Sequence, residues 1–458
     1  MEGELHLGRG VSGRGALGWL GVDQLTEAGF DAAQLASDLI RIDTTNRGGG
    51  DGCERPAAEY VAARLAEAGA DPVLLEAAPG RANVVARISG SDPGAPALLL
   101  HGHLDVVPAD PASWSVHPFS GEIRDGVLWG RGAVDMKNAD AVLLAVVRQW
   151  ARTGRLPRRD VVLAFTADEE DTTEYGSQWL VERHPGLFDG CTEAVGESGA
   201  FTFHAGDGQR LYPVASAERG TAWLKLTARG RAGHGAKPHP DNAVVRLSAA
   251  MARIGAHSWP VRLIPTVRAA IEAIAAASGR PAPAFDLGAS ELLATLGPAG
   301  ALVAGTIRNS ANPTMLKAGY KINVIPDEAV GYVDGRVLPG GEDEFVATVS
   351  ELTGADVTWE YVYHGEPLEA PLDAPVVARM AQALLAEDPG SVVVPYCMSG
   401  ATDAKAFARL GMACYGFTPL VLPEGYDYYA MFHGTDERIP LSALHSAVRI
   451  MDQFLTEP

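Results

Sequence analysis

The chain has 458 residues, 47% of them hydrophobic, and a formal net charge of −20. One hydrophobic core rarely serves a chain of this length, so we expect two domains. The negative charge disfavours nucleic acid and acidic membrane surfaces as partners. Because the sequence contains no apolar run of about 18 residues, we expect no segment to span a membrane.

The four cysteines lie far apart and form no CxxC pair, which argues against a disulfide framework and suits a reducing cytoplasm. Residues 1–30 are expected to be an N-terminal extension, since their Gly/Arg-rich start lacks the pattern of a signal peptide. The stretch "GRGVSG" at residues 8–13 matches GxGxxG. No strand precedes it, so it does not indicate a dinucleotide site.

Strands and helices alternate in the first part of the chain and again after about residue 365. The expected helices are 31–42, 55–68, 138–150, 176–182, 374–387, 401–410 and 441–455. The expected strands are 82–88, 97–100, 160–166, 193–196 and 392–395. This alternation predicts an α/β domain, discontinuous over 31–217 and 365–458, with a mixed, mostly parallel sheet covered by helices.

Residues 218–364 show a different pattern and are expected to form an inserted domain. Polar and apolar residues alternate at 221–227, as in a half-solvated antiparallel strand. A helix at 242–254, strands at 321–324 and 328–336, a helix at 342–352 and a strand at 357–362 come next. The order β-α-β-β-α-β predicts a ferredoxin-like α+β fold.

Side chains that bind metals follow several predicted strands of the first domain. His103 and Asp105 come after the strand at 97–100, Glu169 and Glu170 after "VVLAFTA", and Glu197 after "EAVG". Two further candidates lie in loops: Asp135 in "WGRGAVDMKNA" and His433 in "MFHGTDERI". Because ligands of open α/β sheets bind beyond the carboxyl ends of the strands, these side chains can converge.

The set His103, Asp135, Glu170, Glu197 and His433 has too many negative charges to be buried together without a cation. Five side chains suffice for two ions that share one bridging carboxylate. Mixed nitrogen and oxygen ligands predict two divalent ions, zinc first, with cobalt or manganese as alternatives.

Asp105 is expected to accept the ring N–H of His103 and so to orient it. Glu169 is left over, and a free carboxylate beside the ions can move a proton from water to a leaving amine.

Each residue alone has a simpler explanation. The HxD pattern can be incidental, the Glu pair a solvated face, Asp135 a helix cap, and His433 a surface histidine. Glu193 competes for the role of Glu197, and His101 is expected to be structural or to support a ligand. Their joint occurrence at strand ends favours the metal site.

Six motifs occur together in one order: "HGHLDVVP", "WGRGAVDMKNA", "TADEE", "GHGAKPHPDNA", "INVIPDEA" and "HGTDERI". In this combination the chain resembles the M20 metallopeptidase family over about residues 31–456. That family includes glutamate carboxypeptidase, succinyl-diaminopimelate desuccinylase, acetylornithine deacetylase and aminoacylase-1. The resemblance implies that Asp135 bridges the ions, that His103 and Glu197 hold one, and that Glu170 and His433 hold the other. Glu169 would be the general base.

The resemblance also implies that the inserted domain is a lid through which two chains form a homodimer. His234 would then polarise the scissile carbonyl in the partner subunit's site, and Asn323 would contact the same region. Arg336 would bind the substrate carboxylate, and Gly400 of "SGATDAKAF" would offer its backbone there. Without the resemblance, a surface ion pair for Arg336 and a loop-capping role for His234 would be favoured.

We therefore expect a cytoplasmic two-metal amidohydrolase, a deacylase or carboxypeptidase, that cleaves N-acyl amino acids or small peptides with a free carboxylate. The alternatives are a hydrolase of other C–N bonds, such as those of N-carbamoyl amino acids, and a non-catalytic metal-binding homologue. The spare carboxylate of Glu169 argues against the last. Two departures from the family pattern, the polar "DTTEYGS" and the long stretch 258–304, are expected to reshape the pocket, the cleft cover or the dimer contact.

Overall fold

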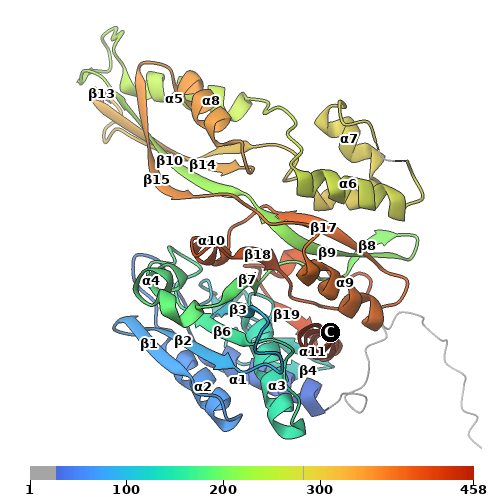
Figure 1. Cartoon of the computed structure of the whole chain (residues 1–458). Coiled ribbons are helices and arrows are strands. Elements are labelled where there is room, and N and C mark those ends of the chain that lie inside the picture. Colours follow the sequence, from blue (N-terminus) through green and yellow to red (C-terminus); the bar gives the residue numbers. More distant parts are fainter. Residues whose placement is uncertain (1–26, 282, 458) are drawn as a thin grey trace, which may run out of the picture.

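The computed structural model describes residues 27–281 and 283–457, so most of the expected N-terminal extension, residues 1–26, lies outside it. The chain forms a large sheet of ten strands and a small sheet of four, each with its own helices (Figure 1). The helices beside the large sheet are α1 Glu27–Arg41, α2 Arg55–Glu67, α3 Lys137–Thr153, α4 Ser177–Arg183, α9 Pro375–Glu387, α10 Ala404–Ala408 and α11 Leu441–Thr456.

The large sheet has the strand order β1-β2-β6-β3-β7-β18-β9-β16, and β8 and β17 also pair with β9. The four strands β6, β3, β7 and β18 run parallel, as do β9 and β17, while the outer pairs are antiparallel. This confirms the predicted mixed sheet. Its strands are β1 Val73–Ala78, β2 Arg81–Ile88, β3 Ala97–His103, β6 Val161–Thr166, β7 Cys191–Gly196, β8 Phe203–Gly206, β9 Gln209–Glu218, β16 Leu368–Glu369, β17 Val392–Met398 and β18 Ala413–Gly416.

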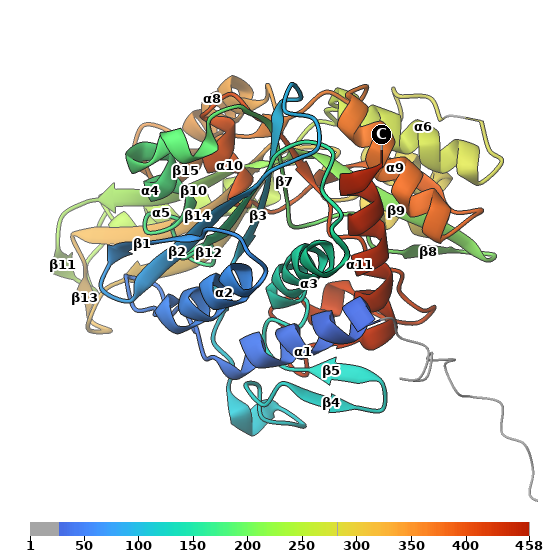
Figure 2. The ribbon, with the colours of Figure 1, turned by 60° about the horizontal axis from the view of Figure 1, so that its bottom comes forward.

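Helices cover both faces of the large sheet. Figure 2 shows α1, α2, α3 and α11 grouped together, and their apolar side chains form one core with β2, β3 and β6. The helices α4 and α10 cover the opposite face in a smaller core. Every residue of β3 and β6 is buried, as expected of parallel strands between two layers. No helix in the part of the chain that is described is long and apolar enough to cross a membrane.

The small sheet has the order β12-β14-β10-β15, with antiparallel pairing throughout. Its strands are β10 Gly220–Arg229, β12 Ser310–Ala318, β14 Glu328–Val337 and β15 Val357–Gly365. The helices α5 Ala243–Ala256 and α8 Glu342–Thr353 pack on it. Along the chain the elements follow the predicted order β-α-β-β-α-β.

The second strand of this unit lies earlier in the chain than predicted. It is β12, whereas residues 321–323 form a turn and only the short β13 Val324–Ile325 comes next, paired with β11 Gly233–His234. The strand β12 is an edge strand with mostly exposed side chains and a register shift at Pro313. Proline is tolerated at such irregular edges, but it conceals a strand in the sequence pattern.

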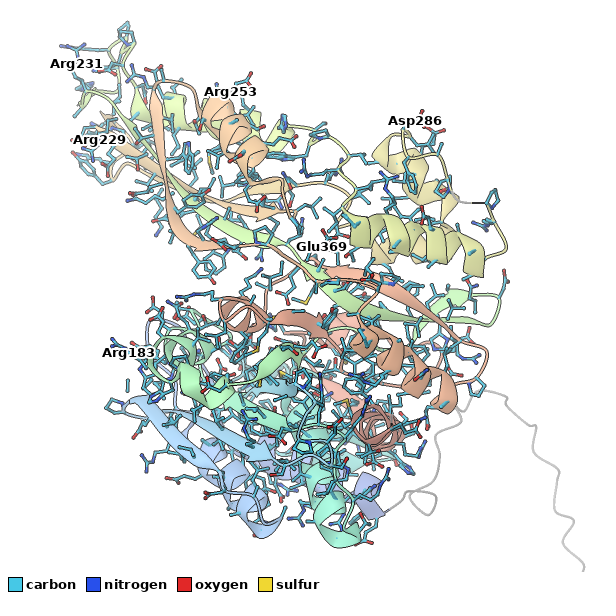
Figure 3. All side chains as sticks on the ribbon, viewed as in Figure 1. Arg183, Arg229, Arg231, Arg253, Asp286 and Glu369 are labelled. Atoms are coloured by element: carbon cyan, nitrogen blue, oxygen red, sulfur yellow. The ribbon has the colours of Figure 1, made fainter. Side chains whose placement is uncertain are left out.

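The long stretch 258–304 holds α6 Pro265–Ala277, α7 Ala289–Thr295 and the 3-10 helix η4 Gly297–Leu302. The predicted boundaries place it in the inserted domain, but α6 packs on β17 and β9 of the large sheet. Glu369 of β16, labelled in Figure 3, accepts the backbone N–H of Thr266 at 2.9 Å. The chain therefore passes between the large and small sheets four times.

A third sheet beside α1 connects the loop of Asp135 with the loop of His433. It contains β4 Glu122–Arg124, β5 Val127–Trp129 and β19 Arg438–Pro440, with β5 in the middle. The strand β5 leads into the loop of Asp135, and β19 comes after the loop of His433. Their antiparallel pairing brings two segments about 300 residues apart to the same place.

Phe345→Ala should destabilise the small domain by about 3–5 kcal/mol, because it removes a large ring from a closed core. Phe345 is 1% exposed and its ring stacks on Trp259 at a centroid distance of 5.1 Å. The measurement is urea unfolding followed by circular dichroism. Its neighbour Val346 is 36% exposed, so Val346→Ala is the matched control and should change little. Equal effects of the two substitutions would contradict this assignment of the core.

Candidate metal centre and active-site cleft

The predicted donors meet at one edge of the large sheet. The strands β6, β3 and β7 are parallel neighbours, so their carboxyl ends lie side by side. His103 is the last residue of β3, Glu197 comes directly after β7, and Glu169 and Glu170 follow β6 by a few residues. Because all three strands end here, their side chains share one small space.

Five of these side chains form two triads that share Asp135. The first is His103, Asp135 and Glu197, and the second is Asp135, Glu170 and His433. The Nε2 of His103 lies 3.1 Å from Asp135 Oδ1 and 3.9 Å from Glu197 Oε2. The Nε2 of His433 lies 3.2 Å from both Asp135 Oδ2 and Glu170 Oε2.

These separations fit two divalent ions bridged by Asp135. Two ligand atoms that bind zinc tetrahedrally are about 3.4 Å apart, since each bond is about 2.1 Å long. Glu170 Oε1 is buried and has no hydrogen-bond partner among the described residues. An orphaned carboxylate oxygen costs stability, which a cation in the second triad would restore.

The pKa values at the site show how strongly its carboxylates attract positive charge. Hydrogen bonds to Asp135 and Glu170 raise the pKa of His433 to about 10. Burial lowers the pKa of His103, but the bond to Asp135 and the charges of Glu197 and Glu169 outweigh it and hold that pKa well above its usual value. Burial, followed by the charge of Glu197, raises the pKa of Glu169. Protons and divalent ions therefore compete for this cluster.

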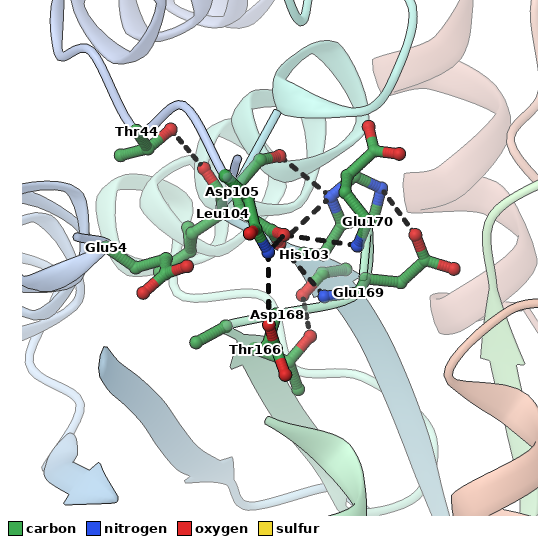
Figure 4. A network of polar contacts seen from close by, with 12 residues as sticks. Thr44, Glu54, His103, Leu104, Asp105, Thr166, Asp168, Glu169 and Glu170 are labelled. Carbon is green, nitrogen blue, oxygen red and sulfur yellow. Dashed lines mark hydrogen bonds and ion pairs between the residues drawn. The ribbon is translucent and has the colours of Figure 1, made fainter. Parts of the chain in front are cut away.

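Asp105 supports the site differently from the prediction. The Nδ1 of His103 lies 3.0 Å from the backbone oxygen of Asp105 but 3.6 Å from its carboxylate, which is too long for a hydrogen bond. The carboxylate instead accepts the backbone N–H groups of Glu169 and Glu170, both at 3.1 Å (Figure 4). Asp105 thus orients His103 through its main chain and holds the two glutamates through its side chain.

A buried network extends from Asp105 to Arg81. Asn46 donates to Asp105 at 2.9 Å and to Asp168 at 3.1 Å. Arg81, 1% exposed, donates to Asp168 at 2.9 Å and to both carboxylate oxygens of Glu54. Asp168 immediately precedes Glu169 and has a positive φ of 65°. The network therefore fixes an irregular turn that aims Glu169 into the site.

Glu437 holds the loops of Asp135 and His433 together. Its buried carboxylate accepts the N–H groups of Gly132, Val134 and Asp135 at 2.6–3.0 Å. It also accepts Arg131 Nη1 at 2.7 Å. Glu437 belongs to the motif "HGTDERI", but the motif alone did not predict this role. The only local signal is an acidic residue directly before a strand.

A cleft of about 450 Å³ opens from the triads toward the small sheet. Its lining includes Asp135, Glu169, Glu170, Glu197 and His433, and also Arg336 and Gly400. Its other large side chains are aromatic or apolar, which the sequence did not reveal: Trp223, Tyr363, Tyr396, Met398, Tyr429 and Phe432. No residue from 258–304 lines this cleft among those the structure describes.

Two predicted residues lie outside the cleft of their own chain. His234 is exposed in β11, where its Nδ1 accepts the N–H of Ala236 at 3.1 Å. Asn323 lies beside it, since its backbone oxygen accepts the N–H of Gly235. Figure 1 shows β13 at the tip of the small domain, away from β3, and Figure 2 labels its partner β11 beside it.

Asp105→Asn should weaken metal binding about 10-fold to 100-fold, because the amide offers one acceptor where the backbone of Glu169 and Glu170 requires two. The measurement is competition with a chelator of known affinity. Asp110→Asn is the matched control. Asp110 is exposed in the following loop and only caps the short 3-10 helix η2 Pro111–Ser113. Unchanged metal affinity in Asp105→Asn would contradict the role given to its side chain.

Comparison with characterised proteins identifies relatives of this chain. The chain is 28% identical over 394 residues to the N-fatty-acyl-amino acid synthase/hydrolase PM20D1 of Xenopus tropicalis, covering 81% of this chain and 74% of that protein. It is 28% identical over 361 residues to the succinyl-diaminopimelate desuccinylase of Xanthomonas campestris, covering 77% of this chain and 81% of that enzyme.

The fold also matches solved structures. The M20 family metallo-carboxypeptidase of Sulfolobus solfataricus superposes with a TM-score of 0.68 at 17% identity, covering 93% of this chain and 98% of that one. The family model for peptidases M20/M25/M40 matches residues 99–457. The chain therefore belongs to the M20/M25/M40 peptidase family and is a hydrolase, as its ordered motifs predicted.

Proposed function

We propose that this protein is a two-metal amidohydrolase that releases the amine from N-acyl amino acids or small peptides with a free carboxylate. One observation carries the proposal: five donors form two triads that share Asp135, and the carboxylate of Glu169 remains beside them. Glu169 Oε2 lies 3.9 Å from His103 Nε2 without belonging to either triad.

In this proposal His103 and Glu197 hold one divalent ion, Glu170 and His433 hold the other, and Asp135 bridges them. Zinc is the proposed metal, with cobalt or manganese as alternatives, because the donors are mixed nitrogen and oxygen. Such ions polarise the amide carbonyl and make water more acidic.

Glu169 then moves the proton. Its carboxylate accepts a proton from the attacking water and delivers it to the nitrogen of the departing amine. Its raised pKa suits both tasks, since a carboxylate with an ordinary, low pKa holds a proton too weakly to act as an efficient base. The network from Arg81 through Asp168 keeps the side chain aimed at the reacting atoms.

The cleft offers different surroundings to the carboxylate and to the acyl group of the substrate. The guanidinium of Arg336 is suited to a carboxylate, and Gly400 exposes backbone in the same wall. The aromatic lining is suited to a large apolar group, so we propose substrates with a long or aromatic acyl group rather than a short polar one. The name of the PM20D1 relative, an N-fatty-acyl-amino acid hydrolase, supports this preference.

We further propose a homodimer in which His234 of one subunit serves the cleft of the other. His234 and Asn323 are exposed at the end of the small domain and take no part in the cleft of their own chain. An imidazole brought near the scissile carbonyl would stabilise the negative charge that develops on its oxygen.

We propose that the protein is located in the cytoplasm, which is a reducing compartment. The four cysteines are all free, and two of them, Cys397 and Cys414, are buried. Burial raises the pKa of both thiols, which makes them poor nucleophiles and suits a structural role.

The protein supplied with zinc, cobalt or manganese should hydrolyse N-acyl amino acids in a panel of acyl groups. Glu169→Ala should keep its metal and lose at least about a hundredfold in turnover, since proton transfer is removed. His103→Ala should lose metal as well. Metal content by mass spectrometry and amine release are the measurements. Wild-type turnover in Glu169→Ala would contradict the assigned base.

Mixing His234→Ala with Glu169→Ala should restore activity if His234 acts across the dimer. Each variant alone is inactive, but half of the randomly mixed dimers contain one intact site, so about a quarter of wild-type activity returns. The two proteins are unfolded together, refolded and assayed, with each protein refolded alone as the control. Failure to recover activity would place His234 outside the partner's reaction.

A further inference from the structure

One buried arginine, Arg219 between β9 and β10, has no carboxylate partner among the described residues. Three arginines are buried in the part of the chain that is described: Arg81, Arg131 and Arg219. Arg81 pairs with Glu54 and Asp168, and Arg131 pairs with Glu437. Arg219 is 8% exposed, yet no described carboxylate lies within ion-pair distance of its guanidinium.

Arg219 is held only by neutral groups. Its Nη1 donates to Ser310 Oγ at 3.0 Å, and its Nε donates to the backbone oxygen of Ser399 at 3.3 Å. The adjacent acid, Glu218, is occupied by Thr402 and by Lys405, whose Nζ lies 3.7 Å away. A buried guanidinium bound to neutral groups keeps most of its charge uncompensated.

This charge lies beside the cleft, behind the lining residue Ser399. Ser399, Gly400 and Tyr396 line the cleft, and Arg219 contacts the first of them. Burial lowers the pKa of Arg219 to about 10, and the positive charge of nearby Arg336 contributes to this shift. Arg336 is already engaged by Asp334, 2.8 Å from its Nε, and Asp334 forms its ion pair with Arg336 rather than with Arg219.

We propose that Arg219 is a specificity-determining residue for the substrate carboxylate: it supplies the uncompensated positive charge of this subsite and fixes the Ser399–Gly400 turn that borders it. The inference rests on the proposed function, because it concerns the same cleft. The ligand class is a free carboxylate on the α-carbon that is bonded to the scissile amide nitrogen, and Arg336 acts as the partner cation.

The test compares an N-acyl amino acid with its carboxamide, which has the same scissile bond but no negative charge. The protein is assayed with zinc bound. Arg219→Gln should raise KM for the acid about 10-fold to 100-fold, as expected for loss of a charged interaction, and leave kcat and the amide's KM within about twofold. Arg219→Lys should restore part of the preference for the acid, because it keeps the charge.

Arg253→Gln is the matched control. Arg253 also donates only to neutral groups, the backbone oxygens of Leu352 and Thr353, and it lies in the small domain away from the cleft (Figure 3). It should change neither substrate's KM. If Arg219→Gln raised KM equally for the acid and the amide, Arg219 would have a structural role and the proposal would be overturned. An unchanged KM for both substrates would also overturn it.

A second variant leaves Arg219 in place. Arg336→Gln should reduce the preference for the acid without abolishing it, since one cation remains. Complete loss of the preference in Arg336→Gln would overturn the proposal even if Arg219→Gln failed to fold. A wild-type protein that hydrolyses neither compound would contradict the proposed function. In that case, comparing the dissociation constants of acid and amide in the wild type and in Arg219→Gln would still test the role of Arg219.

Discussion

Repulsion among the acidic side chains at the carboxyl edge of the large sheet is the constraint on which the rest of the site depends. The side chains of Asp105 and Asp168 are buried, and Asp135, Glu169, Glu170 and Glu197 lie at the same edge. Backbone N–H groups, Asn46 and Arg81 compensate Asp105 and Asp168. Among the described residues, the cationic groups within ion-pair distance of the other four carboxylates are two imidazoles, and His433 is largely exposed. Divalent ions suit such a donor set, so metal binding, in competition with protons, offsets the cost of gathering the acids.

Two carboxylates that bind no metal decide whether the donors converge. Asp105 accepts hydrogen bonds from the backbone of Glu169 and Glu170, and Glu437 accepts them from the loop of Asp135. Each therefore organises one half of the site through main-chain N–H groups, which stay in place when side chains move. This explains how Asp135 and His433 join the donors at the ends of the three parallel strands, although both come from irregular loops. The short sheet of β4, β5 and β19 brings those two loops together.

Features that depend on a local pattern were predictable from the sequence. The strand β6 and the first half of β3 are apolar runs, and each predicted metal donor stands at a strand end or in a distinctive loop, so the sequence pattern indicated both the strands and the donors. Glu437 and Arg131 lie 306 residues apart, and Arg81 and Asp168 lie 87 apart, so no local pattern joins them. The strand β12 was missed because an exposed edge strand with a proline shows little alternation. The aromatic lining of the cleft was also not predicted, because its members come from separate elements of both sheets.

In the proposed function, charge rather than shape would set the direction in which a substrate lies in this cleft. The aromatic lining suits a large acyl group, but it does not fix where the carboxylate lies. The acids at the sheet edge oppose entry of a carboxylate until cations balance them, because Coulomb repulsion is strong in a small, partly buried space. In the proposed function, the positive charge of Arg219 and Arg336 would then draw the substrate carboxylate to their part of the cleft and leave the adjacent amide bond beside Glu169. The acids on one side and the arginines on the other would thus align the bond that is cut.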